Sequence, residues 1–354
     1  MKGGTALNIL QYKLNAIMAK SRSVYGKRLT GKDYESLVNC SSVAEITSYL
    51  RASTAYAKVL ENKASNDISA GHLEFLIRKF GAETFERLYR YEVAFGQELY
   101  NCFVKKVEIE IILSKIRGIL LGKTEDIVVS GSKLSREINE IDMYKVAKAE
   151  NMEQLASALD STPYKSVIRK CMRDPLCDFL DYESAFLNYF HEYEYGLIKK
   201  CYGRNNDLLK LLSQKADTEF IDKVYRIKKY FNASSDSTLR NTAPVHLTDF
   251  SQKQISELIN ASDENAVLSV LEKTKYKEYA RKIREADYAE QAIAQLNYKK
   301  YKHLLRFSRD PNEVMFCFMF LTENEISNLI HIIEGVKYKM DTESIKELLI
   351  GVGD

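Results

Sequence analysis

The sequence is poor in the two residues that most often interrupt helices. Only 4 of its 354 residues are proline and only 15 are glycine, and both residue types destabilise a helix interior. This scarcity favours an all-α fold. The length exceeds the size at which one hydrophobic core usually stops growing, so two or three subdomains are expected.

An excess of charge of one sign is also missing. The 52 basic and 49 acidic residues give a net charge of +3, whereas nucleic-acid-binding proteins usually carry a large basic excess or a concentrated basic stripe. We therefore expect no nucleic-acid partner. The main local exception is the segment Lys299-Lys300-Tyr301-Lys302-His303. We interpret it as a solvated helix face whose tyrosine packs inward.

Long apolar runs and closely paired cysteines are absent as well. The longest apolar run, residues 314–321, is far shorter than the roughly 18 residues of a transmembrane helix. Residues 1–19 lack the apolar core of a signal peptide. The six cysteines include no CxxC pair. We predict a cytoplasmic protein without direct membrane insertion, whose thiols are reduced and mostly packed.

Signatures of catalysis and of ligand binding are missing too. The sequence has no GxGxxG, GxSxG, HExxH or Glu-x-x-His motif, and Cys171 and Cys177 are spaced too loosely to suggest zinc. Residues 118–124 resemble the phosphate-binding loop motif GxxxxGK[ST], but they have three residues between the two glycines where the motif has four. They also follow the apolar stripe of a helix, and we interpret them as a helix end. We predict no catalytic residue, no cofactor and no metal.

A first module, a helix pair that ends in Thr-x-Tyr, recurs three times. Its copies open at Leu29-Thr30, Leu134-Ser135 and Leu247-Thr248, and they close at residues 54–56, 162–164 and 274–276. The Thr or Ser at each opening is a candidate N-cap, because its side-chain oxygen can accept a free backbone N–H. The repetition predicts three related helical units.

A second module is an amphipathic helix. Glu108 and Glu325 each precede an apolar stripe of helical spacing that ends at Gly118 and Gly335, respectively. We predict that each glutamate lies in the first turn of a helix and that each glycine forms a left-handed C-cap. Thr322 would open the last copy as a capping box. A degenerate middle copy would run from Asp222 to Asn232.

Longer aromatic-rich segments separate these modules, and we predict long helices at residues 73–103, 178–202 and 276–320. Asp174-Pro175 and Asp310-Pro311 have the form of helix starts. The order of elements predicts an N-terminal helix within residues 1–28. Three repeat units would follow, at residues 29–133, 134–246 and 247–354.

Repeats of this kind also suit a helical array without a particular function, but two segments carry a family resemblance. Residues 12–16 and 27–34 resemble the opening of the C subunit of the V-type ATPase/ATP synthase, whose eukaryotic counterpart is the d subunit. Residues 323–329 and 333–340 resemble the C-terminal motif of that family, with Glu334 where arginine is usual. The resemblance covers essentially the whole chain.

The resemblance implies a funnel of three similar helical subdomains around a pseudo-threefold axis. It implies a non-catalytic rotor subunit that couples the central shaft (subunits D and F) to the membrane proteolipid ring and transmits torque during ion transport. Such a subunit is peripherally associated with the membrane. We expect two end faces, each burying at least roughly 1,000 Å², to carry the function; their contact residues are not identified by the motifs. The alternatives are a free-standing helical interaction scaffold and a helical enzyme.

Overall fold

The computed structural model describes residues 15–61, 68–89, 97–122, 140–202, 207–231 and 248–352. All secondary structure in these ranges is helical, which confirms the all-α prediction. The chain forms two compact units. Unit 1 combines Met1–Tyr100 with Ala294–Asp354, and unit 2 comprises Asn101–Ile293. The division at residues 28, 133 and 246 stays a prediction.

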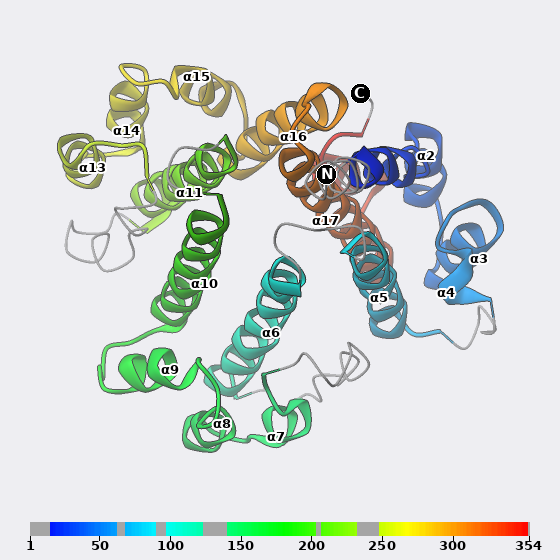
Figure 1. Cartoon of the computed structure of the whole chain (residues 1–354), viewed down its shortest axis with the longest axis horizontal. Coiled ribbons are helices and arrows are strands. Elements are labelled where there is room, and N and C mark those ends of the chain that lie inside the picture. Colours follow the sequence, from blue (N-terminus) through cyan, green and yellow to red (C-terminus); the bar gives the residue numbers. More distant parts are fainter. Residues whose placement is uncertain are drawn as a thin grey trace, which may run out of the picture. The chain divides into compact units, whose positions relative to one another are not determined.

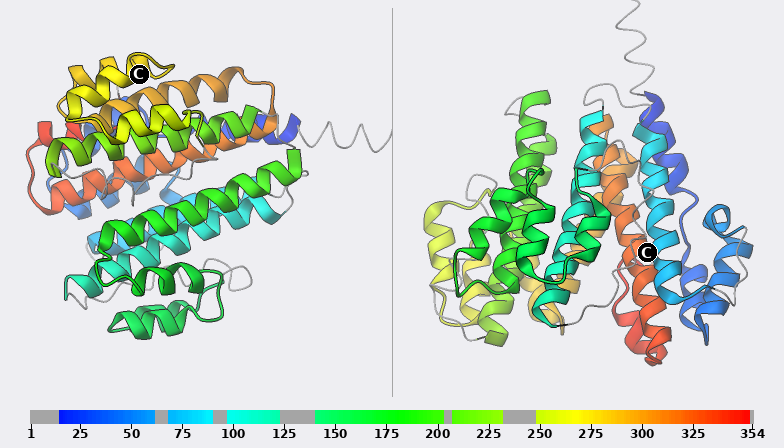
Figure 2. Two further views of the ribbon diagram at one scale, coloured as in Figure 1. Left: turned by 90° about the vertical axis from the view of Figure 1, so that its left-hand side faces the viewer. Right: turned by 90° about the horizontal axis from the view of Figure 1, so that it is seen from below.

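Unit 1 joins the two ends of the sequence. It contains a helix at residues 15–25, the described part of the predicted N-terminal helix. Its other helices are α2 (Gly31–Val38), α3 (Val43–Ser53), α4 (Ala57–Leu60), α5 (Ala70–Tyr89), most of α16 (Ala289–Phe307), α17 (Pro311–Lys337) and α18 (Thr342–Glu347). The long helices α5 and α17 lie side by side (Figures 1 and 2). Their core includes Leu73 and Ile333, which pack with Ile46 and Leu50 of α3.

Unit 2 contains two groups of short helices and the long helices that they contact. In chain order the helices are most of α6 (Gln97–Leu120), α7 (Met143–Lys148), α8 (Met152–Ala158), α9 (Lys165–Met172), α10 (Phe179–Tyr202), α11 (Asp207–Arg226), the π-helix η2 (Ile227–Phe231), α13 (Gln252–Ile259), α14 (Glu264–Leu271) and α15 (Lys277–Glu285). Helices α10 and α11 lie side by side (Figure 2). Helix α9 packs on α10, and α14 packs on α11 (Figure 1).

Short helices occur in three groups of three, which we call triplet 1 (α2–α4), triplet 2 (α7–α9) and triplet 3 (α13–α15). All three use the same capping order. The first helix of each has a side-chain N-cap, as does the second, whereas the third follows a tyrosine without such a cap. The N-caps of the first helices are Thr30, Asp142 and Ser251, and those of the second are Ser42, Asn151 and Asp263.

The predicted openings of the first module are therefore only partly right. Thr30 is an N-cap and forms a capping box with Asp33, as its position predicts. Thr248 is not a cap, because its hydroxyl donates to Asp217; the helix begins later, behind Ser251. Ser135 lies outside the described residues, and the first helix of triplet 2 follows Asp142.

The Thr-x-Tyr motif ends the second helix of each triplet by the same bonds. Each threonine hydroxyl donates to a leucine carbonyl three or four residues earlier and accepts the N–H of the tyrosine two residues later. The threonines are Thr54, Thr162 and Thr274, and the tyrosines are Tyr56, Tyr164 and Tyr276. Satisfying a free carbonyl and a free N–H together stops the helix in a defined turn. The motif thus places each tyrosine identically within its triplet.

The predicted limits of the amphipathic helices are wrong. Helix α6 begins 11 residues before Glu108 and α17 begins 14 residues before Glu325, so both glutamates lie inside their helices. Thr322 also lies inside α17, where its hydroxyl donates to the carbonyl of Phe318. The long preceding aromatic segments simply continue the helices, and the acidic residue is not a sign of a first turn.

The predicted glycine caps are wrong for a related reason. Both helices continue through Gly118 and Gly335, and the left-handed residues come four positions later, at Gly122 (φ 65°) and Lys339 (φ 58°). Gly335 has a packing role instead. A Cβ atom there would lie 2.6 Å from Cγ1 of Ile345, the buried residue of α18.

The remaining helix predictions have mixed outcomes. Residues 178–202 form one long helix, but 73–103 span α5 and part of α6, and 276–320 span α15, α16 and the start of α17. Asp310 caps α17 with Pro311 at the first position, as predicted. Asp174 does not start a helix, because α10 begins only at Phe179, behind Asp178. Asp222 lies within α11, and Asn232 lies outside the described residues.

Two further predictions concern the basic segment around Tyr301 and insertion into the membrane. Tyr301 is fully buried within α16, as the interpretation of the basic segment requires. No described helix is both long enough and apolar enough to cross a bilayer.

Candidate functional site

Each triplet is joined to a long helix by a carboxylate that binds the triplet's tyrosine. We call these groups carboxylate–tyrosine centres and number them as the triplets. Their carboxylates are Glu325 in α17 for centre 1, Glu108 in α6 for centre 2 and Asp217 in α11 for centre 3. They contain no exposed nucleophile, and their bonds define what the three repeats share.

Centre 2 has the most complete set of bonds. The hydroxyl of Tyr164 donates to Oε2 of Glu108 at 2.6 Å. The other oxygen, Oε1, accepts the backbone N–H groups of Glu140 at 2.7 Å and Ile141 at 3.2 Å. Residues 140 and 141 lead into the first helix of triplet 2, and Tyr164 leads into the third. A single carboxylate therefore fixes the start of the first helix and the start of the third helix to α6.

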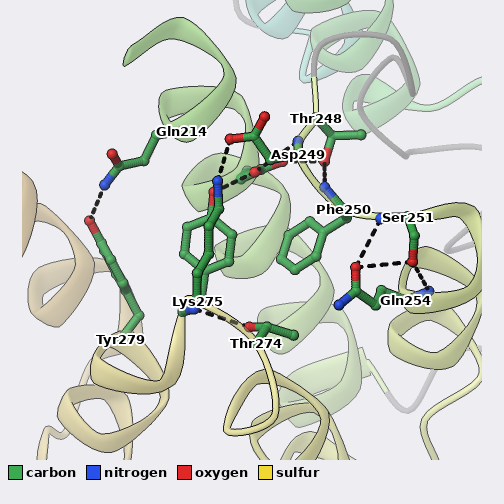
Figure 3. A network of polar contacts seen from close by, with 11 residues as sticks. Gln214, Thr248, Asp249, Phe250, Ser251, Gln254, Thr274, Lys275 and Tyr279 are labelled. Carbon is green, nitrogen blue, oxygen red and sulfur yellow. Dashed lines mark hydrogen bonds and ion pairs between the residues drawn. The ribbon is translucent and has the colours of Figure 1, made fainter. Parts of the chain in front are cut away.

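Centre 3 repeats this arrangement with a shorter acid. Asp217 accepts the hydroxyl protons of Tyr276 and Thr248, and it accepts the N–H of Asp249 at 3.1 Å. Figure 3 shows Thr248 and Asp249 at this centre, with Lys275 beside them; Lys275 forms an ion pair with Asp249. The extra hydroxyl of Thr248 completes the carboxylate's shell in place of a second backbone N–H.

Centre 1 joins residues from opposite ends of the chain. The hydroxyl of Tyr56 donates to Oε1 of Glu325 at 2.9 Å, and the N–H of Leu29 donates to Oε2 at 2.9 Å. Leu29 precedes the first helix of triplet 1, so its position matches that of Ile141 in centre 2. Glu325 is partly buried and lines a pocket with Arg28 and Thr30.

The pKa shifts of the carboxylates and tyrosines have the same directions in all three centres. Burial raises the pKa of Glu108, Asp217 and Glu325, while the hydrogen bonds from tyrosine and backbone act in the opposite direction. Burial, followed by the neighbouring carboxylate, raises the pKa of the partner tyrosines far above the ordinary value. Each tyrosine therefore stays protonated at neutral pH and remains a hydrogen-bond donor.

Lysines add positive charge beside two of the centres. The ammonium of Lys105 is 2.6 Å from Glu140 and 5.5 Å from the ring centroid of Tyr164. The ammonium of Lys275 is 4.9 Å from the ring centroid of Tyr276. Charge near a buried carboxylate offsets part of its desolvation cost. The charge of Lys275 lowers the pKa of Asp217 against the effect of burial, whereas Lys105 forms an ion pair with Glu140 beside centre 2.

These bonds define what the centres can do chemically. Glu108 is 1% exposed and Asp217 is 0% exposed, and their oxygens already accept bonds from within the protein. They are therefore placed to orient helices and not to contact a substrate. Among the described residues, no group of three or more His, Cys, Asp or Glu side chains is arranged to hold a metal ion.

The C-terminal motif has a related structural role. Asn324 and Asn328 both donate to the carbonyl of Ile350, and Oδ1 of Asn328 accepts the N–H of Ile350 at 2.9 Å. One turn of α17 therefore holds the end of the described chain, while Glu325 in the same turn holds triplet 1. Asn324, Glu325 and Asn328 of this motif are thus positioning residues.

Sequence reasoning singled out Glu108, Glu325 and all three tyrosines, but it did not bring them together, and it missed Asp217. A usable signal was present. Tyr164 follows its carboxylate by 56 positions and Tyr276 follows its own by 59. Counting back 56 positions from Tyr276 reaches Phe220, which is flanked by Asp217, Glu219 and Asp222, so the spacing limits the candidate carboxylates to these three.

Together, the fold and the centres define a class of protein: an all-helical repeat protein in which buried carboxylates fasten short-helix triplets to long helices. The family follows from comparison with known proteins. The chain belongs to the ATP synthase (C/AC39) subunit family, whose model matches residues 17–348.

Three curated relatives, each described as the C subunit of an A-type ATP synthase, resemble the chain. The protein of Pyrococcus abyssi is 20% identical over 350 residues, which cover 94% of this chain and 88% of the relative. That of Methanosphaera stadtmanae is 22% identical over 268 residues (73% and 65%). That of Pyrococcus furiosus is 21% identical over 248 residues (68% and 64%). The matches to the last two span slightly less than two thirds of those relatives.

Proposed function

We propose that the chain is a non-catalytic central-rotor subunit of a V-type ATPase/ATP synthase. It couples the central shaft, made of subunits D and F, to the proteolipid ring in the membrane, and it transmits torque during ion transport. The family match over residues 17–348 is the observation that carries this proposal. The names of the three relatives support membership of such a complex.

The carboxylate–tyrosine centres support a mechanical role. A part that transmits torque must not deform under load, and packed helices have low compressibility. Pulling triplet 2 from α6 would separate Glu108 from Tyr164 and from two backbone N–H groups. Each buried polar group left without a partner costs about 1–3 kcal/mol. Every centre therefore opposes sliding of a triplet along its long helix.

The same proposal includes the architecture and location that the family resemblance implies. Three similar subdomains surround a pseudo-threefold axis, and two end faces contact the shaft and the ring. The subunit lies on the cytoplasmic side and is attached to the membrane through the complex. The shared capping order of the three triplets supports the threefold relationship.

Membrane vesicles prepared from cells that lack the subunit test the proposal. We expect the catalytic head to keep hydrolysing ATP, while the ATP-driven membrane potential, read with a potential-sensitive dye, disappears and returns on adding back the purified chain. A dye that reports the membrane potential responds to any transported cation, so the assay does not depend on which ion the complex moves. Unchanged ion transport after deletion would refute the coupling role.

Two further observations separate the alternatives. Recovery of neither shaft nor ring proteins with the tagged chain from detergent-solubilised membranes would favour a free-standing scaffold. Hydrolysis of ATP by the purified chain alone would refute the non-catalytic assignment.

A further inference from the structure

Two cysteines whose spacing suggests no shared site meet in the structure of unit 2. Cys171 lies in the last turn of α9, and Cys177 lies in the loop that leads to α10, with five residues between them. The thiol of Cys177 donates a hydrogen bond to the sulfur of Cys171. The five described cysteines are all free thiols. The two sulfur atoms are therefore in contact without a covalent bond between them.

A pair of backbone turns produces this contact. The carbonyl of Cys171 accepts the N–H of Asp174 at 3.0 Å, and the carbonyl of Asp174 accepts the N–H of Cys177 at 3.1 Å. The carboxylate of Asp174 also accepts the N–H of Leu176 at 3.0 Å, which is the bond of an Asx turn. Two turns that share Asp174 thus fold the loop back and bring the second cysteine beside the first.

The pair lies at the edge of the apolar core around triplet 2. Cys171 is 8% exposed and belongs to that core, whereas Cys177 packs against it and is partly exposed. Leu176, the neighbour of Cys177, is 75% exposed, so the loop borders on water. A reagent in solution can therefore reach the second sulfur, and the first sulfur is placed to resolve the product, as a resolving cysteine does.

We propose that Cys171 and Cys177 are a modification site, a dithiol that closes to a disulfide under oxidation. With hydrogen peroxide as oxidant, one thiolate attacks an oxygen atom, the O–O bond breaks, and a sulfenic acid and hydroxide form. The sulfur of the other cysteine then attacks the sulfenic sulfur, the S–S bond forms and the S–O bond breaks. Two thiols and one peroxide thus give one disulfide and two molecules of water. The inference is independent of the proposed function.

Burial makes this reaction slow at neutral pH. It raises the pKa of Cys171, and burial followed by the charge of Cys171 raises the pKa of Cys177 to about 12. Asp174 and Asp181 act in the same direction, and Lys170 opposes them at Cys171. Because the thiolate is the reactive form, the rate should rise about tenfold per pH unit between about pH 7 and 9. The pair therefore responds to sustained oxidation and not to a brief pulse.

The disulfide would fasten the end of α9 to the loop before α10. The folded chain already holds the two sulfur atoms in contact, whereas the unfolded chain would lose conformations when the loop is closed. We therefore expect the equilibrium constant for disulfide formation to be at least about tenfold larger in the folded chain than in the unfolded chain. By linkage, oxidation would increase the folding equilibrium constant of unit 2 by the same factor.

Equilibration of the purified full-length chain with reduced and oxidised glutathione measures this constant, with and without urea. One glutathione disulfide oxidises the two thiols and leaves as two glutathione molecules. Free thiols are then alkylated, and the chain is digested with trypsin. Trypsin cuts after Lys170, Arg173 and Lys199, so the two cysteines fall in different peptides. Mass spectrometry should show these two peptides joined, and dithiothreitol should separate them.

Three serine variants separate this pair from other thiols. Cys171→Ser and Cys177→Ser should each abolish the joined peptides. Cys40→Ser is the matched control, because Cys40 is another partly exposed cysteine and lies in unit 1; this variant should form the joined peptides as the wild type does. Circular dichroism verifies that the variants fold. The wild-type measurement itself requires no substitution, so it stands even where a variant is unstable.

The outcomes decide the inference in either direction. Joined peptides that form at least about tenfold more favourably in the folded chain support it. Glutathione attached to Cys177 in place of the joined peptides overturns it, and so does an equilibrium constant no larger than that of the unfolded chain. A peroxide reaction whose rate does not rise with pH contradicts the thiolate step. None of these measurements involves ATP hydrolysis or ion transport, so their failure leaves the proposed function standing.

Discussion

Removal of a single hydroxyl group from centre 2 gives the sharpest test of the fastening role. In the variant Tyr164→Phe the ring stays in place, but the hydrogen bond to Oε2 of Glu108, 2.6 Å long, is lost. Glu108 keeps its two backbone N–H donors. The tyrosine side chain is completely buried, so we do not expect water to replace the missing donor.

The expected cost follows from the charge of the acceptor. Hydrogen bonds to charged groups contribute about 1.5–3 kcal/mol to stability. Burial already raises the pKa of Glu108, so the weakened carboxylate can take up a proton and limit the loss. We therefore expect Tyr164→Phe to lower the free energy of unfolding of unit 2 by about 1.5–3 kcal/mol at neutral pH.

Urea unfolding followed by circular dichroism measures this loss. With slopes of about 2–3 kcal/mol per M, the midpoint should fall by roughly 0.5–1.5 M. Tyr144→Phe, at an exposed position of the same unit, is the control, and its effect should stay within about 0.5 kcal/mol. A Tyr164→Phe variant as stable as the control would show that the centre does not hold the triplet.

Other perturbations test the remaining features. Tyr56→Phe and Tyr276→Phe should destabilise by the same roughly 1.5–3 kcal/mol if the three centres are equivalent, and a tenfold disparity in unfolding constants would argue against equivalence. Gly335→Ala should lower the free energy of unfolding by about 1 kcal/mol or more, because the added Cβ would clash with Ile345. The second substitution Ile345→Val should restore part of this loss. Gly196→Ala is the control: nothing lies near its Cβ position, so it should stabilise the protein by about 0.5–1 kcal/mol. Burial raises the pKa of Glu108 in the folded protein. The contribution of this side chain to the free energy of unfolding is therefore complete at a pH below its ordinary pKa, and it is lost as the pH rises through the raised pKa. The stability of the wild type relative to Glu108→Gln should therefore increase as pH falls from about 8 to about 5, and an opposite trend in urea midpoints would contradict the burial argument.

Local signals in the sequence predicted the repeated elements well. The Thr-x-Tyr motif forms hydrogen bonds between residues two to four positions apart, such as those of Thr162 with Leu159 and Tyr164. The N-cap at Thr30 and the Asp310-Pro311 start are equally local. These features are visible in a single sequence because all the interacting groups lie within one turn.

Features that depend on distant partners were misjudged. Glu108 and Glu325 looked like first-turn acids, since nothing nearby reveals that a tyrosine from another helix binds them. Gly335 looked like a cap, although its lack of a side chain makes room for Ile345. Asp217 escaped notice because its partners, Thr248 and Tyr276, are 31 and 59 positions away. Helical periodicity does not encode such contacts.

Chain order separates centre 1 from the other two centres. Centres 2 and 3 join residues no more than 59 positions apart, whereas centre 1 joins Tyr56 to Glu325 across 269 positions. Each carboxylate of unit 2 precedes its triplet, but the carboxylate of triplet 1 comes near the end of the sequence. Closing the longer loop costs only about 1 kcal/mol more, because loop entropy grows with the logarithm of length. One centre with its buried bonds offsets that cost, so the last long helix can complete the first triplet, and the repeat closes through both ends of the chain.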